Sequence, residues 1–318
     1  MIVEKVFEGC FEDVALQRAR KTGETYRTGL NAFQRFLEFK KIAPTDGHEK
    51  LTPEIFISYC SWLLTEGYKK KTVNVYVSAA KFMIDWMVVN GLIEVSYNQG
   101  VRLDMARKST RQKREDSLPR FPKLEDVEKM QDAVRQIQYN AKFVDAAMLR
   151  ARDIAIIEFL VSSGCRNNEI VQMKISDLDF IERKGIVTGK GSKQRVVFFS
   201  QEAVDAMRDY WKLRGFGSAN DPVFSRHDRG NSKKKIHVKT TTHTIGNVVK
   251  GVAIVAGIPA DKFTPHYFRH AYAIKMLRQT GNLALVQDML GHSSPASTRV
   301  YAKIYPDDLR DAYREVFG

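Results

Sequence analysis

Cysteine is scarce in this chain, and long apolar runs are missing. Only three of the 318 residues are cysteine, and Cys10, Cys60 and Cys165 lie far apart. That is too few for a disulfide framework or a cysteine zinc site, so a reducing, cytosolic setting fits best. The longest apolar stretches, such as 82–89, fall well short of the roughly 20 residues that a membrane span needs. The start MIVEKVFEGC lacks the features of a signal peptide, which leaves a cytoplasmic enzyme or binding protein with no membrane partner.

Acidic residues are few relative to basic ones. The sequence has 37 Asp and Glu against 51 Lys and Arg, a formal net charge of +14 at pH 7. This surplus favours a polyanionic partner such as nucleic acid. Neither a P-loop nor a His-Glu-x-x-His motif occurs, and we interpret Asp177 and Asp179 as a helix end and a turn rather than as a metal-binding pair.

The hydrophobic pattern divides the chain into two domains. A small all-helical domain is expected over residues 1–106, because apolar residues recur there at three- and four-residue spacing. The periodic segments lie around 14–40, 53–66 and 71–90. Residues 107–118 interrupt the pattern with a run of Lys and Arg, which predicts a basic linker, and residues 119–318 form the second domain.

The second domain combines helices with one small sheet. The stretch 154–161 is strongly apolar, and a further helix is expected to begin at Asn167. Two β runs, Ile186–Thr188 and Arg195–Phe199, flank a Gly-rich turn and predict a hairpin. An apolar stripe predicts a terminal helix over 307–317. The expected fold class is therefore mainly α with a small antiparallel β-sheet.

The segment from 264 to 306 is the richest in residues that could carry chemistry. Thr264 as N-cap and Pro265 at the first helical position predict a helix that Gly281 can close. This helix presents His266 and Arg269 on one face near its positive end, where free amides favour an anion. A phosphate group is the anion that we expect to bind there.

Two more residues follow in the same segment. A shorter helix over 283–290 ends at Gly291, so that His292 comes next, and the following helix presents Tyr301. The histidines could be structural, the arginine could pair with a carboxylate, and Tyr305 lies one turn beyond Tyr301. Composition alone does not choose between these alternatives.

Five motifs, taken in order, resemble the tyrosine recombinases of the phage integrase family, which includes the Xer-type recombinases. They are SSGCRNNEI around Arg166, the GKGSKQR hairpin, His266-x-x-Arg269, Leu290-Gly291-His292, and Tyr301 nine residues after that histidine. The resemblance covers about the last half of the chain. The first domain resembles the family's helical, SAM-like core-binding domain by pattern. The resemblance implies a simple two-domain, site-specific DNA recombinase with a C-terminal catalytic domain.

The resemblance also implies a role for each matching residue. Arg166 and Arg269 would hold the scissile phosphate through paired N–H donors. His266 would accept the proton of the attacking Tyr301, and His292 would donate to the oxyanion.

Two further residues of the catalytic set come from the other motifs. Lys190 matches the general acid that protonates the departing 5′-oxygen, with Lys193 in the same turn as its rival. Glu169 resembles the carboxylate that orients the arginine and offsets its charge, although an ordinary helix-surface glutamate is the alternative.

The implied reaction needs no cofactor and no metal. Attack by Tyr301 gives a 3′-phosphotyrosyl link and a free 5′-hydroxyl, and the bond energy is kept for rejoining. Integration, excision and dimer resolution are all consistent with this chemistry. The alternatives are a type IB topoisomerase-like DNA relaxing enzyme and a non-cleaving DNA-binding protein of the same fold.

The partners implied are duplex DNA carrying a specific recombination site and further copies of the chain, as a dimer on each site and a tetramer in the synapse. The terminal helix would dock either on its own domain or on a neighbour. Basic residues outside the catalytic set are candidate DNA contacts: Lys69, Lys70, Lys71, Arg107, Lys108, Arg111, Lys113, Arg114, Lys193, Lys233, Lys234 and Lys235.

Overall fold

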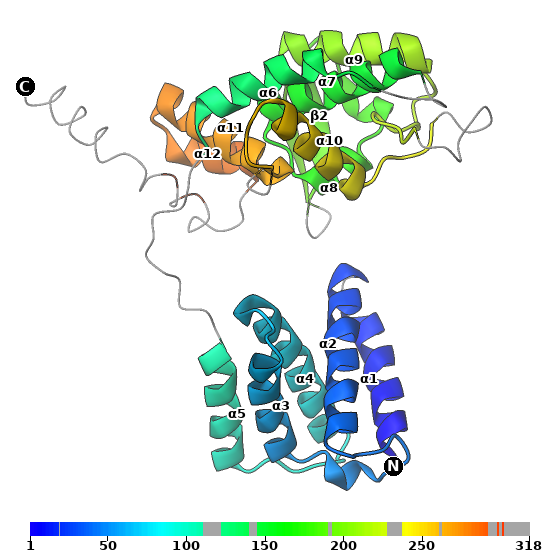
Figure 1. The fold of residues 1–318 in the computed structure, drawn as a ribbon, viewed down its shortest axis with the longest axis vertical. Coiled ribbons are helices and arrows are strands. Elements are labelled where there is room, and N and C mark those ends of the chain that lie inside the picture. The colour runs from blue at the N-terminus through cyan, green and yellow to red at the C-terminus, as the bar shows by residue number, and fades with distance from the viewer. Residues whose placement is uncertain are drawn as a thin grey trace, which may run out of the picture. The chain divides into compact units, whose positions relative to one another are not determined.

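The chain folds into two compact units, Met1–Ser117 and Leu118–Gly318 (Figure 1). A computed structural model describes residues 1–18, 20–110, 122–139, 145–189, 193–227, 237–260 and 263–291, together with residues 298 and 301. Several predicted features lie outside these residues: Lys190, His292, the terminal helix over 307–317, and the candidate contacts Arg111, Lys113, Arg114, Lys233, Lys234 and Lys235. No helix in the described ranges is both long and apolar enough to cross a membrane.

The amino-terminal unit is helical, as predicted. Its helices are α1 (Val3–Gln17), α2 (Arg20–Phe39), α3 (Pro53–Thr65), α4 (Lys70–Val89) and α5 (Tyr97–Thr110), with a short 3₁₀ turn at His48–Lys50. The expectation of one periodic segment over 14–40 is wrong, because the backbone is extended at Arg18 (φ −117°, ψ 143°) and separates α1 from α2.

Aromatic side chains form the centre of this unit. Phe33, Phe36 and Tyr59 are fully buried, and the Tyr59 hydroxyl donates to the Gly29 carbonyl oxygen at 3.1 Å. Gly29 is needed where α2 crosses α4, because a Cβ there would lie 2.9 Å from the Cβ of Ala79. The close approach of these two helices fixes the unit's core.

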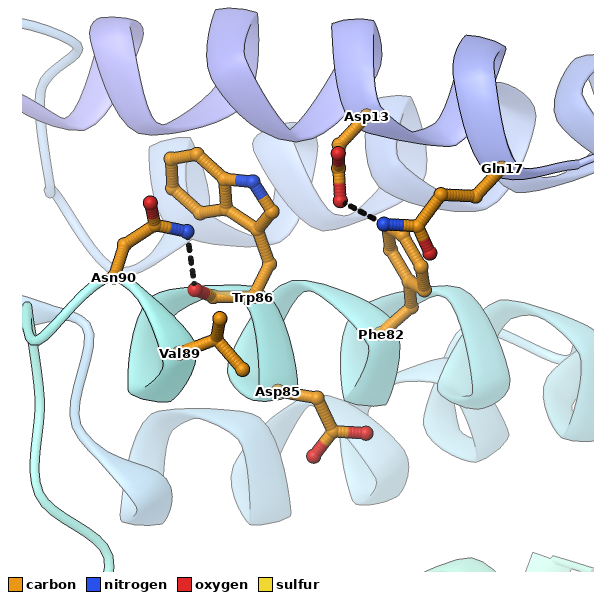
Figure 2. Close-up of a pocket in the computed structure, with 7 residues that line it drawn as sticks. All are labelled: Asp13, Gln17, Phe82, Asp85, Trp86, Val89 and Asn90. Atoms are coloured by element: carbon orange, nitrogen blue, oxygen red, sulfur yellow. Dashed lines mark hydrogen bonds between the residues drawn. The ribbon is translucent and has the colours of Figure 1, made fainter.

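A shallow hollow lies between α1 and α4 (Figure 2). Asp13, Asp85 and Trp86 are among the residues that line it, and Gln17 Nε2 donates to Asp13 at 2.6 Å. The two carboxylates do not leave the hollow uniformly acidic, because Lys81 Nζ donates to Asp85 Oδ1 at 2.7 Å.

The basic residues predicted near the linker lie partly on a helix. Because α5 runs to Thr110, Arg107 and Lys108 belong to its last turn. Positive side chains in the last turn of a helix are favoured by its negative end.

The carboxy-terminal unit is built around α7 (Ala146–Ser163). The apolar stretch 154–161 lies inside this helix, and most of it is buried against α6 (Leu124–Gln136), α9 (Gln201–Arg214) and α11 (Pro265–Thr280) (Figure 1). Charged groups on α7 are paired, since Arg152 Nε donates to Asp153 at 2.7 Å. The unit is completed by α8 (Asn167–Gln172), α10 (Thr242–Val255), α12 (Leu283–Leu290) and a 3₁₀ turn at Ile175–Asp177.

One antiparallel sheet of three strands packs beside these helices. The strands β1 (Leu178–Asp179), β2 (Lys184–Thr188) and β3 (Gln194–Phe198) follow each other in sheet order, with Ile186 opposite Val196. The predicted hairpin is confirmed, whereas β1 has only two residues and carries no alternating pattern that would reveal it. Asp179 Oδ1 accepts from two backbone amides of the following turn, as its interpretation as a turn residue requires.

Candidate active site

The turn between α7 and α8 positions Arg166. Gly164 ends α7 in the left-handed conformation (φ 60°), and Arg166 occupies the N-cap of α8. The carboxylate of Glu169 accepts from the Arg166 backbone amide at 2.7 Å and from the Arg166 guanidinium at 2.9 Å. One buried carboxylate therefore holds both the backbone and the side chain of the predicted phosphate ligand.

Glu169 also binds a second arginine, Arg195 on β3, which the sequence did not single out. The two guanidinium nitrogens of Arg195 donate to the two carboxylate oxygens at 2.7 and 2.9 Å. Burial alone would raise the pKa of Glu169, but the bonds from Arg195 and from Arg166 outweigh it and hold that pKa below its ordinary value. Glu169 is 3% exposed and fully ionised between two cations, so the alternative of an ordinary surface glutamate is wrong.

The third arginine of the site comes from α11, whose predicted boundaries are confirmed. Thr264 is its N-cap, Pro265 its first residue, and Gly281 closes it with φ 61°. Arg269 is buried and donates to the carbonyl oxygens of Gly164 at 2.8 Å and Leu290 at 2.6 Å. Burial, together with the nearby Arg166 and Arg195, lowers the pKa of Arg269 to about 10. The guanidinium remains charged at neutral pH.

The three arginines meet at the carboxyl end of α12. Its successive carbonyl oxygens each accept from a different guanidinium: Met289 from Arg195 at 3.2 Å, Leu290 from Arg269 at 2.6 Å and Gly291 from Arg166 at 3.2 Å. The last carbonyls of a helix have no partner within it and carry its negative partial charge, which suits cationic donors. Arginines from three separate elements thereby hold the backbone of residues 289–291 in place, immediately before residue 292.

Glycine is required at this end of α12. Gly291 has φ 63°, and a Cβ there would lie 2.7 Å from Cδ of Arg195. Both the left-handed backbone and the close packing of Arg195 exclude a side chain at this position.

His266 is exposed near the start of α11. Desolvation, and then the positive charges of Arg269 and Arg166, lower its pKa below the ordinary value, so the imidazole is neutral near pH 7. It shares the electrostatic environment of the arginines and can accept a proton or donate to a phosphate oxygen.

Tyr301, the predicted nucleophile, is buried, with only 2% of its surface exposed. Its hydroxyl forms a hydrogen bond of 2.7 Å with Nδ1 of His270. Burial raises the pKa of the phenol, and the nearby Arg269 opposes part of that rise. The sequence analysis missed His270, although its position four residues after His266 places both imidazoles on one face of α11.

The predicted general acid lies outside the described residues, but its surroundings are partly visible. Gly189, immediately before Lys190, approaches Glu169: a Cβ on it would lie 3.6 Å from a carboxylate oxygen. The rival Lys193 is exposed, and its carbonyl oxygen accepts from the Gly189 amide at 2.7 Å, which closes the hairpin.

Taken together, the described part of the site is a cluster of positive charge near the Tyr301 hydroxyl. Three guanidinium groups, Arg166, Arg195 and Arg269, surround a single carboxylate, which leaves two positive charges for an anion. Such donors suit the nonbridging oxygens of a phosphodiester. Within the described ranges no group of three or more His, Cys, Asp or Glu residues could hold a metal ion.

Comparison with known proteins decides the family. The phage integrase family matches residues 126–307, and the N-terminal SAM-like domain of phage integrases matches residues 9–91. The chain belongs to the phage integrase family. Its enzyme class is that of the tyrosine-type site-specific recombinases.

Two curated relatives align with nearly the whole length of this chain. Tyrosine recombinase XerC of Pediococcus pentosaceus is 28% identical over 315 residues, which cover 96% of this chain and 94% of that protein. Tyrosine recombinase XerD of Rhizobium meliloti is 29% identical over 296 residues, covering 92% of this chain and 88% of that protein.

Solved structures share the fold. The XerH site-specific recombinase bound to a palindromic difH substrate has a TM-score of 0.68 at 21% identity, over 91% of this chain and 78% of that one. A lambda integrase dimer bound to a COC′ core site has a TM-score of 0.67 at 14% identity, covering 96% of this chain and 97% of that one. The predicted fold class is confirmed.

Proposed function

We propose that this recombinase binds duplex DNA at a specific site, cleaves one strand through Tyr301 and rejoins it to a partner strand. The observation that carries the proposal is the convergence of Arg166 and Arg269 beside a buried tyrosine, with Glu169 and Arg195 bracing them. A phosphodiester bound by the arginines would supply negative charge to balance this excess of positive charge.

The proposed reaction exchanges one phosphoester bond for another. The Tyr301 oxygen attacks phosphorus, the bond to the 5′-oxygen breaks, and the phenolic proton passes to an imidazole. Arg166 and Arg269 stabilise the charge that builds on the nonbridging oxygens, while Lys190 protonates the departing 5′-oxygen and His292 donates to the oxyanion. A 5′-hydroxyl from a partner duplex then reverses the step without any external energy source.

Basic residues of the amino-terminal unit are proposed to hold the DNA backbone. Lys69, Lys70 and Lys71 are exposed at the start of α4, where cations are electrostatically unfavourable for the helix itself. Their placement is therefore better explained by a contact with an anion outside the protein.

The cellular setting and assembly are part of the same proposal. Among the similar structures, lambda integrase is a dimer bound to a core site and XerH is bound to its difH substrate. We infer for this recombinase a cytoplasmic, nucleoid-associated location, a dimer on each DNA site and a tetramer in the synapse.

A nicked suicide duplex tests the chemistry, because its cleaved fragment diffuses away and traps the covalent product. We expect a protein–DNA adduct that resists SDS, and we expect Tyr301→Phe to abolish it while DNA binding persists. Retention of the adduct in Tyr301→Phe and its loss in Tyr305→Phe would overturn the choice of nucleophile.

A supercoiled plasmid with two sites separates the rival functions. Exchange between the sites supports recombination, whereas relaxation without exchange would identify a topoisomerase-like enzyme. Tight binding without any adduct would identify a non-cleaving DNA-binding protein.

A further inference from the structure

The hydrogen bond between Tyr301 and His270 has chemical consequences. A general base must lie within about 2.6–3.2 Å of the group whose proton it removes. Nδ1 of His270 lies 2.7 Å from the Tyr301 hydroxyl oxygen, and the two rings lie with their centroids 5.7 Å apart. His266, the residue that the family resemblance favours for this task, makes no hydrogen bond to Tyr301 among the described contacts.

We propose that His270 is the catalytic residue that takes the proton from Tyr301 during strand cleavage and returns it during rejoining. The inference rests on the proposed function, because it concerns the step in which Tyr301 attacks phosphorus. It leaves His266 free to donate a hydrogen bond to the phosphate.

The state of His270 fits this role. Burial lowers the pKa of His270, and electrostatic repulsion from His266 and Arg269 on the same helix lowers it further. The ring is therefore neutral near pH 7. To accept from Tyr301 at Nδ1, it must carry its own proton at Nε2. The residue as a whole is exposed, which allows the ring to exchange protons with solvent.

The environment of Tyr301 makes a base necessary. The phenol is 2% exposed, and its burial raises its pKa, so water cannot readily take the proton and little phenolate forms unaided. Arg269 stabilises the phenolate as the oxygen approaches phosphorus.

The proton balance of the step is simple. The O–H bond of Tyr301 breaks as the bond from its oxygen to phosphorus forms, and the proton moves to Nδ1 of His270. The bond from phosphorus to the 5′-oxygen breaks, and that oxygen takes a separate proton from the general acid. Rejoining reverses both transfers and leaves His270 neutral again.

Two substitutions distinguish proton transfer from mere anchoring. Glutamine at 270 can still hydrogen-bond to Tyr301 but cannot take up its proton, whereas alanine removes both functions. We expect His270→Gln and His270→Ala each to slow cleavage of the suicide duplex by about 10²- to 10⁴-fold, the usual contribution of a general base. Half-site DNA affinity should stay at the wild-type value. Gln279→Ala, an exposed change near the other end of α11, is the matched control and should cleave at the wild-type rate.

A second measurement changes the nucleophile rather than the base. Replacing Tyr301 with 2,3,5-trifluorotyrosine makes the phenol more acidic and lessens the need for a base, so the defect of His270→Gln should shrink in this background. A residue that only positions Tyr301 would show the same defect with either phenol.

The outcomes separate this inference from the proposed function. Absence of adduct in the wild-type protein would refute the recombinase chemistry itself. Normal wild-type cleavage with His270→Gln within threefold of it would overturn the role of His270. Faster cleavage in His270→Ala would also overturn it, because that would mean His270 restrains Tyr301 instead of activating it.

Discussion

The ion pair between Glu169 and Arg195 makes a strong prediction about stability. Glu169 has a side chain that is 2% exposed, and Arg195, at 13%, supplies two of its hydrogen bonds. Removing one partner of a buried pair costs roughly 3–5 kcal/mol, because the other charge stays buried without compensation. In Arg195→Met, Arg166 still contacts the carboxylate, so we expect the lower end, about 3 kcal/mol, at pH 7.

The loss should depend on pH in a defined direction. In the wild type the pKa of Glu169 in the folded state lies below its ordinary value of 4.5. The ionised carboxylate therefore stabilises the fold at pH values above 4.5, and this stabilisation is lost as the pH falls through the folded-state pKa. Without Arg195, burial raises the pKa of Glu169, and the carboxyl takes up a proton at a higher pH. The difference in unfolding free energy between Arg195→Met and the wild type should therefore be largest near pH 7 and shrink toward pH 4.5.

Urea denaturation followed by tryptophan fluorescence measures the difference in unfolding free energy, and a single remaining tryptophan restricts the signal to one unit. Trp211 is the tryptophan of the carboxy-terminal unit, so Trp62→Phe and Trp86→Phe together leave a signal from that unit alone. Arg208→Met, at an exposed arginine over the Phe180 ring, is the control and should cost at most about 1 kcal/mol. A loss in Arg195→Met that matches the control, or that is the same at both pH values, would refute the reasoning.

Three further predictions follow from the site and the charge. Gly291→Ala should destabilise the unit by about 1–2 kcal/mol because of its left-handed backbone, and should slow cleavage by displacing Arg195; unaltered cleavage would contradict the packing argument. Replacing Lys69, Lys70 and Lys71 with glutamine should reduce the slope of log affinity against log salt in a filter-binding titration by up to about 0.9 for each lost phosphate contact, and an unchanged slope would exclude them from the interface. Deleting 307–318 should impair cooperative binding to a two-site DNA more than occupancy of one half-site; equal losses in a gel-shift titration would argue against docking on a neighbouring copy.

Much of the fold could be predicted from local signals. Thr264, Pro265 and Gly281 mark α11 because capping, a proline at the first position and a left-handed glycine are local requirements. Gly291 marks the end of α12 for the same reason. The separation of α1 from α2 was missed, because the apolar spacing continues across the extended residue Arg18.

The site was predictable only where a motif carried it. Arg166, Arg269 and Glu169 belong to recognisable motifs, and the structure brings them together. Arg195 ends the GKGSKQR motif but was given no role, because its partner is 26 positions earlier and only the folded hairpin brings the pair into contact. His270 was missed because a histidine next to Arg269 has no meaning until Tyr301, 31 positions later, lies against it.

The identity of the tyrosine that is joined to DNA tests the central claim most directly. Trypsin cleaves after Arg299, Lys303 and Arg310, so Tyr301 falls in the peptide 300–303 and Tyr305 in the peptide 304–310. After trapping on the suicide duplex and digestion with nuclease and trypsin, mass spectrometry should find the nucleotide on 300–303, joined through its 3′-phosphate. A nucleotide on 304–310, or a link through a 5′-phosphate, would contradict the account.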